Sequence, residues 1–191
     1  MTPQVAVAAP FYRELYTKVR GETDPIREFY GEFRNRSRKG RKRHEELWCD
    51  VSPHLLALMM ELVPDGDIDP SSINGRLAEH ECEVEFTWVG PAGRCAVRIL
   101  LVDLAEGNPV RRFGVNGLLA DWGGYRDDRG IYRSILKHGE VEIRSDDFLH
   151  IMVADFVDSV GDKGGRVWVD GPRALRNQDA LVRVLDGLVR E

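Results

Sequence analysis

Apolar and polar residues alternate along residues 81–102, with a single turn between two runs. The apolar positions are Cys82, Val84, Phe86 and Trp88 before the turn, and Cys95, Val97, Ile99 and Leu101 after it. A period of two residues predicts β-strands, and Gly90-Pro91-Ala92-Gly93 predicts the turn of a hairpin. With Pro91 and Ala92 as the loop, Trp88 faces Cys95 and Glu85 faces Arg98. Both apolar sets then lie on one face, which fixes the register.

The first quarter of the chain instead carries apolar residues at helical spacing. The two stripes are Tyr12, Leu15, Tyr16 and Val19, and Ile26, Phe29, Tyr30 and Phe33. Gly21 suits the end of one helix, and Asp24-Pro25 suits the start of another. The spacing therefore predicts an N-terminal helix hairpin. We assign residues 1–48, this hairpin plus a basic segment, as an appendage to a single α+β domain of residues 49–191.

Further elements are predicted along the rest of the chain. They are a buried helix from Ser52, a loop over 65–78, mainly loops over 105–130, strands over 131–136 and 140–144, a helix after Ser145, a strand over 166–169 and a last helix capped by Asn177. The predicted fold class is α+β. A mostly antiparallel sheet is built on the 81–104 hairpin, and two C-terminal helices pack on one sheet face.

Charge is distributed unevenly. The net charge is −5, yet residues 34–43 carry seven cations and no acid: Arg34, Arg36, Arg38, Lys39, Arg41, Lys42 and Arg43. Clustered cations bind polyanions by releasing condensed counterions. The leading hypothesis is therefore a non-catalytic binding or assembly module that contacts DNA, RNA or an acidic protein surface through this segment. Alternatively, the basic segment docks on the acidic residues Glu81, Glu83 and Glu85 of its own chain.

A second hypothesis is enzymatic. The order helix, three strands, helix, strand over about residues 50–170 resembles the core of the PD-(D/E)xK nuclease superfamily. That resemblance implies a Mg²⁺ site made by Asp103 and Glu142 (or Glu140), with Glu61 on the preceding helix. The chain departs from the pattern at Arg144, which stands where the superfamily has lysine and which stays protonated.

A third hypothesis is a subunit of a protein assembly that docks through the aromatic hairpin. Its surface would be formed by Tyr12, Tyr16, Phe29 and Phe33. Apolar stripes more often pack within their own chain, so burial of these four rings would remove the basis for this hypothesis.

Other chemistry is sparse. Cys49, Cys82 and Cys95 form no disulfide framework, which indicates a reducing cytoplasm. His80, Cys82 and Cys95 offer three zinc ligands where four are needed, and His44, His54, His138 and His150 have no companion at ligand spacing. We therefore predict no resident metal or cofactor. The longest apolar run, Leu55–Met60, is too short to cross a membrane, and the N-terminus has no signal-peptide pattern.

Overall fold

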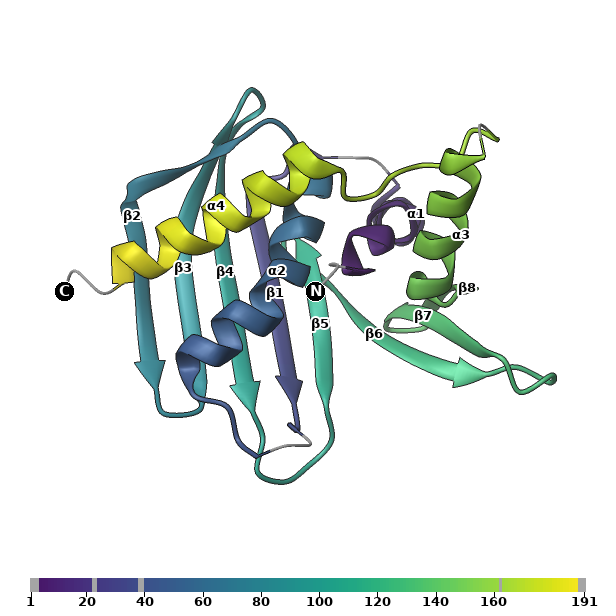
Figure 1. Ribbon diagram of the computed structural model, residues 1–191, viewed down its shortest axis with the longest axis horizontal. Helices are drawn as coiled ribbons and strands as arrows, with labels where there is room; N and C mark the ends of the chain where they lie inside the picture. The colour runs from purple at the N-terminus through teal and green to yellow at the C-terminus, as the bar shows by residue number, and fades with distance from the viewer. Residues whose placement is uncertain (1–3, 22–23, 38–39, 162, 189–191) are drawn as a thin grey trace.

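The computed structural model describes residues 4–21, 24–37, 40–161 and 163–188 (Figure 1). The elements follow the order η1 (Gln4–Val7), α1 (Ala8–Arg20), β1 (Glu28–Asn35), α2 (His44–Leu62), β2 (Asp67–Ala78), β3 (Glu81–Gly90), β4 (Gly93–Asp103), β5 (Val110–Val115), β6 (Leu118–Arg126), β7 (Tyr132–His138), β8 (Val141–Asp146), α3 (Phe148–Val160) and α4 (Gly171–Leu188). No described helix is both long enough and apolar enough to span a bilayer.

The strands form one eight-stranded sheet in the order β2-β3-β4-β1-β5-β6-β7-β8. Strand β1 runs parallel to β4, and the other neighbouring pairs are antiparallel. All helices visible in Figure 1 lie toward one side of this sheet. The predicted α+β class, with a mostly antiparallel sheet and two C-terminal helices, is confirmed.

The predicted hairpin is confirmed residue by residue. Trp88 pairs with Cys95 and Glu85 with Arg98, and the pairing ends at Gly90 and Gly93, on either side of the two-residue loop. Every apolar position of both runs is buried. The opposite face carries charge, and Arg98 Nε lies 3.4 Å from Glu85 Oε1.

The predicted second helix of the N-terminal hairpin is wrong, because Glu28–Asn35 forms strand β1 in the middle of the sheet. Phe29, Gly31 and Phe33 point to the core with the period of a strand. A Cβ on Gly31 would lie 2.8 Å from the methyl carbons of Leu55, so α2 packs closely over this glycine and a larger residue would displace the Leu55 side chain. The glycine hides the alternation and leaves the aromatic residues at helix-like spacing.

Several other predictions need correction. Residues 67–78 form β2, and residues 110–126 form β5 and β6, where mainly loops were predicted. The strand predicted over 166–169 is absent from the described residues there. Helices α2 and α4 begin earlier than predicted, since Ser52 and Asn177 lie inside them. The boundary predicted after residue 48 falls within α2, and that division stays a prediction.

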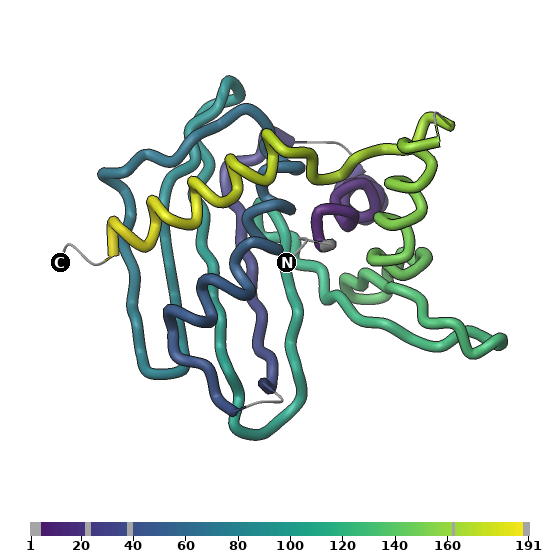
Figure 2. Tube along the Cα trace, in the orientation of Figure 1, coloured from purple at the N-terminus to yellow at the C-terminus, as the bar shows by residue number. Residues whose placement is uncertain are grey.

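Helix α2 is fixed against the sheet by α4. Trp48 Nε1 donates to the carbonyl of Leu181 at 3.1 Å, and Asn177 Nδ2 donates to the carbonyl of Pro53 at 3.0 Å. Because buried donors without acceptors are costly, these bonds orient α2 as well as stabilise it. In Figure 2 the C-terminal helix crosses β2, β3 and β4 beside α2.

The other half of the core is aromatic. Phe11 stacks on Phe148 with ring centroids 5.7 Å apart, Phe148 on Trp122 at 5.5 Å, and Trp122 contacts Phe33 at 6.0 Å. These rings join α1, α3, β6 and β1. The segment η1 contacts both α2 and α3, so it lies between the two halves of the core (Figure 2).

Candidate functional site

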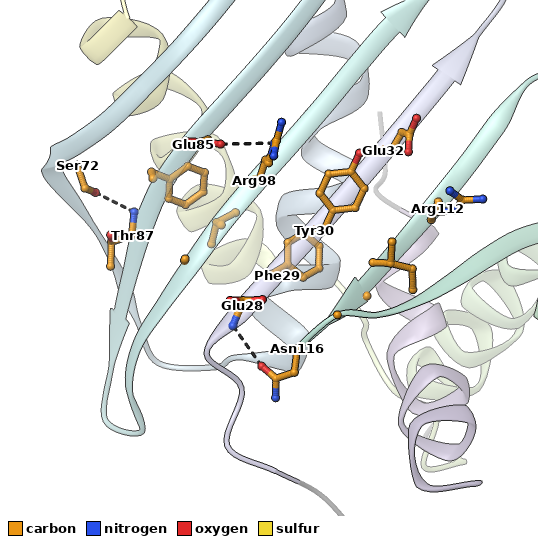
Figure 3. Close-up of a pocket in the computed structure, with 16 residues that line it drawn as sticks. Glu28, Phe29, Tyr30, Glu32, Ser72, Glu85, Thr87, Arg98, Arg112 and Asn116 are labelled. Atoms are coloured by element: carbon orange, nitrogen blue, oxygen red, sulfur yellow. Dashed lines mark hydrogen bonds and ion pairs between the residues drawn. The ribbon is translucent and has the colours of Figure 1, made fainter. Parts of the chain in front are cut away.

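Two of the hollowed regions lie on opposite faces of the sheet. The larger, about 710 Å³, lies on the face that α2 and α4 leave uncovered, and side chains of β1, β3, β4 and β5 line it. Figure 3 shows Glu85, Arg98 and Tyr30 beside one another on three neighbouring strands of this groove.

The arginines of this groove are paired. Arg98 Nε donates to Glu83 Oε1 at 2.8 Å, and Arg112 Nε donates to Asp121 Oδ1 at 2.7 Å. Such pairs across neighbouring strands stabilise a sheet in the ordinary way. The groove therefore shows no described cation left without a carboxylate, and its charges are accounted for by the fold.

The second region is a cavity of about 170 Å³ between α2 and the sheet, which we call the α2 cavity. It gathers polar and charged side chains from α2, β1, β5 and β6. Its lining residues are Val5, Phe33, Asn35, Lys42, Asp50, Val51, His54, Arg111 and Trp122. A carboxylate, an imidazole, two cations and an aromatic wall converge here, which makes this cavity the candidate functional site.

Asp50 and His54 occupy one face of α2, because residues four apart on a helix lie one turn above each other. Asp50 forms an ion pair with Lys42, which stands just before the helix. The carbonyl of Lys42 also accepts a hydrogen bond from Nδ1 of the His80 ring at 2.8 Å. These contacts hold Lys42 at the mouth of the cavity.

His54 is held in its neutral form. Burial lowers the pKa of His54 from 6.5 to about 4, and nearby positive charge that includes Arg111 makes a smaller contribution. A neutral imidazole has a lone pair that can accept a proton, so His54 can act as a base toward a hydroxyl group placed against it.

Arg111 and Trp122 form the opposite wall. The Arg111 guanidinium carbon lies 5.0 Å from the Trp122 ring centroid, and Arg111 Nε lies 3.4 Å from Asn35 Oδ1. Arg111 has no ion pair with a carboxylate among the described residues. The Trp122 side chain is 8% exposed, and its buried Nε1 has no acceptor among the described residues. The Arg111 guanidinium of this wall therefore remains available to an acceptor in the cavity.

A third hollow, of about 520 Å³, adjoins the α2 cavity and shares Asn35, Lys42 and Val51 with it. Its wall is part of the basic segment, including Arg36 and Arg41. The floor is Asp103, whose carboxylate accepts from the backbone N–H of Ser37 at 3.0 Å. Burial raises the pKa of Asp103, but hydrogen bonds from the Lys42 and Ser37 backbone outweigh it and hold that pKa below its ordinary value.

The structure uses the basic segment largely within the chain. Arg34 pairs with Glu32, Lys42 with Asp50, and Arg41 Nη2 donates to the Asp103 carbonyl at 2.8 Å. Arg43 donates its backbone N–H to Glu46 at 2.9 Å, and Arg36 is exposed. Arg38 and Lys39 lie outside the described residues.

The alternative hypothesis placed the basic segment against Glu81, Glu83 and Glu85. The described cations of the segment form no ion pair with these three residues. Arg76 pairs with Glu81, and Arg98 pairs with Glu83 and Glu85. The glutamates of β3 are thus neutralised by arginines of β2 and β4, the strands on either side.

The nuclease residues are not brought together. Asp103 on β4 and Glu142 on β8 have four strands between them, roughly 24 Å along a sheet. Glu142 accepts from Arg144 at 2.8 Å, and Glu61 accepts from Arg166 at 2.6 Å. Among the described residues, no group of three or more His, Cys, Asp or Glu could hold a metal ion.

The aromatic docking surface is also excluded. Tyr12, Tyr16, Phe29 and Phe33 are all buried in the core of their own chain. The sequence reasoning missed the residues that do converge: Asn35, Asp50, His54, Arg111 and Trp122. The Asp-x-x-x-His spacing was the available signal, but it was hidden because the helix was predicted to begin at Ser52.

Comparison with known proteins shows what this fold is similar to. No family model and no curated protein matches the sequence. The chain is similar to UDP-N-acetylglucosamine 3-dehydrogenase GnnA from Acidithiobacillus ferrooxidans, with a TM-score of 0.64 and 16% identity, over 97% of this chain and 61% of that one. It is also similar to a protein from Thermotoga maritima that is assigned as an oxidoreductase. The TM-score is 0.63 and the sequence identity 10%, over 94% of this chain and 58% of that one.

A third solved structure, assigned as an NADPH-dependent oxidoreductase from Desulfitobacterium hafniense, gives a TM-score of 0.58 and 12% identity, over 95% of this chain and 60% of that one. The chain thus spans about three fifths of the length of these structures. At such low identity the likeness establishes a shared fold.

This fold overturns the functional hypotheses drawn from the sequence. The polyanion-binding or assembly module, the nuclease and the aromatic docking subunit are contradicted, because the structural neighbours are dehydrogenases and oxidoreductases. The clustering of charge was real, but its physical meaning was different: the basic segment is folded against Asp103 and Asp50 at the edge of a cavity.

Proposed function

We propose that this chain is the substrate-binding part of an oxidoreductase for small hydroxylated molecules, and that His54 accepts the proton of the substrate hydroxyl. The observation that carries the proposal is the convergence of Asp50, His54 and Arg111 on one cavity. The fold shared with a sugar-nucleotide dehydrogenase over nearly the whole chain supports it.

Oxidation of a hydroxyl to a carbonyl removes a proton from oxygen and a hydride from carbon. Neutral His54 supplies the proton acceptor, while Asp50 and Lys42 orient the entrance through their ion pair. The flat face of an aromatic ring such as Trp122 suits the apolar face of a sugar. With the adjoining hollow, the space suits a sugar-sized ligand with a substituent.

A nicotinamide dinucleotide would be the expected hydride acceptor, since one neighbour is described as NADPH-dependent. Such cofactors are held by spaced glycines at a turn from a strand into a helix. The described part of the β1–α2 connection is cationic, and Asp146 and Asp147 link β8 to α3. Neither described turn fits a dinucleotide, so the proposal assigns this chain substrate binding and proton transfer only.

Calorimetric binding of glucose and of UDP-N-acetylglucosamine tests the proposal. We expect at least one of the two to bind, and His54→Asn to weaken that binding by about tenfold or more. The matched control is His150→Asn, since His150 is exposed on α3 outside the cavity. Absence of binding up to about 10 mM, or equal binding by His54→Asn, would contradict the proposal.

We also propose a cytoplasmic location. Its support is that Cys49, Cys82 and Cys95 are all free thiols, as a reducing compartment allows.

A further inference from the structure

Arg111 is a cation without a carboxylate in a site that otherwise balances its charges. Lys42 and Asp50 neutralise each other at the mouth of the α2 cavity. Among the described residues, the Arg111 guanidinium has no carboxylate partner: Nε donates to the neutral Asn35 side chain, and the group lies against the Trp122 ring. With His54 neutral, the described lining of the cavity carries one net positive charge.

Trp122 forms the wall beside Arg111, but its Nε1 is buried away from the cavity surface and offers no donor to a ligand there. The donor that this wall does offer is the Arg111 guanidinium, which lies against the Trp122 ring. A guanidinium has donors only, so what Arg111 lacks is an oxygen acceptor.

We propose that the α2 cavity recognises substrates that carry a carboxylate, and that Arg111 is the residue that selects for this group. The proposal rests on the function proposed above and names the class of its substrate: a hydroxylated acid such as a sugar acid. A guanidinium matches the two oxygens of a carboxylate in a planar, bidentate pair, which a neutral hydroxyl cannot reproduce.

The placement also connects binding with proton transfer. The positive charge of Arg111 helps to keep the pKa of His54 low. A bound carboxylate neutralises that charge, so the pKa of His54 rises toward the working pH, where a base transfers protons most effectively. An anionic substrate would therefore improve the base that acts on it.

The neighbouring residue offers a matched control. Arg112 follows Arg111 on β5, yet it lines the groove on the opposite sheet face and pairs with Asp121. Arg111→Gln and Arg112→Gln each remove one positive charge, from opposite faces of the same strand. Arg111 lies inside the α2 cavity and Arg112 lies outside it.

The experiment compares glucuronate with glucose, two probes that differ in a carboxylate, by calorimetry at fixed ionic strength. We expect glucuronate to bind the unaltered protein about 10- to 100-fold more tightly than glucose. Arg111→Gln should abolish this preference, Arg112→Gln should keep it, and Arg111→Lys should retain part of it because the charge remains without the planar fork.

Equal binding of glucose and glucuronate, with both weakened by His54→Asn, would overturn the carboxylate proposal and leave the proposed function standing. Binding of neither probe would overturn the carboxylate proposal, and the proposed function would fail with it only if UDP-N-acetylglucosamine also does not bind. Glucuronate preference that survives Arg111→Gln, or that disappears in Arg112→Gln, would assign the selection to another part of the protein. The unfolding temperature of each variant identifies any that fails to fold, and Arg111→Lys then decides.

Discussion

The carboxylate of Asp103, at the end of β4, accepts a hydrogen bond from the backbone N–H of Lys42 at 2.5 Å. Asp103 accepts a second hydrogen bond from the backbone N–H of Ser37. The buried Asp103 side chain therefore holds the basic segment at a residue on each side of Gly40. Asp103→Ala should lower the free energy of unfolding by about 2–4 kcal/mol, because buried backbone donors lose their acceptor. Urea unfolding measures this loss.

The control for that change is Asp121→Ala, which removes an exposed carboxylate paired with Arg112 and should cost less than about 1 kcal/mol. Equal losses for the two variants would refute the anchoring role of Asp103.

Tyr12 connects α1 to the β5–β6 hairpin through one buried hydroxyl. It donates to the carbonyl of Leu118 at 2.6 Å and accepts from the N–H of Val115 at 2.8 Å. Tyr12→Phe should therefore cost about 2–3 kcal/mol of unfolding free energy. Tyr16→Phe is the control, since its longer bond to Asp24 is only partly buried, and we expect a loss under about 1 kcal/mol. Urea unfolding of both variants measures the two losses. A loss for Tyr16→Phe as large as that for Tyr12→Phe would contradict the role of the Tyr12 hydroxyl.

Gly114 allows β5 to turn tightly into β6. A Cβ at this position would lie 2.0 Å from the carbonyl oxygen of Leu118, a backbone atom that cannot rotate away. Gly114→Ala should lower stability by about 2–4 kcal/mol. Gly123→Ala, where the added carbon meets only Ile135 at 3.5 Å, should change stability much less. Thermal unfolding of both variants compares them, and similar midpoints would contradict this packing.

The low pKa of His54 makes stability depend on pH. In the unfolded chain the residue takes up a proton near pH 6.5, but in the folded chain only near pH 4. The unfolded state therefore binds more protons in this window, and stability falls as the pH drops from about 6.5 to 4, by about 1–3 kcal/mol. His54→Asn should lose less stability than the unaltered protein across the same window, whereas His150→Asn should follow the unaltered protein.

The part of the fold that the sequence predicts best is the β3–β4 hairpin, since Trp88 faces Cys95 as the alternation requires. Alternation works there because one face is buried and the other charged. In β1 the same physics is hidden by Gly31, whose missing side chain makes room for Leu55. A contact between distant segments thus decides the residue type, and a local pattern cannot reveal it.

The candidate site shows the same limit. Asp50 and His54 are close in sequence and could be recognised from helical spacing, once the helix is known to begin at His44. Arg111 and Trp122 reach the cavity from β5 and β6. Only the sheet order, which places β1 between β4 and β5, brings them to α2, and nothing local in the sequence predicts that order.

The most direct test of the account is nuclear magnetic resonance of the histidine rings during titration with glucuronate. The described chain has five histidines: His44, His54, His80, His138 and His150. The account predicts that the His54 ring signals shift with a pKa moved upward from about 4, while those of His138 and His150 stay in place. Glucuronate binding that leaves His54 unchanged would contradict the account.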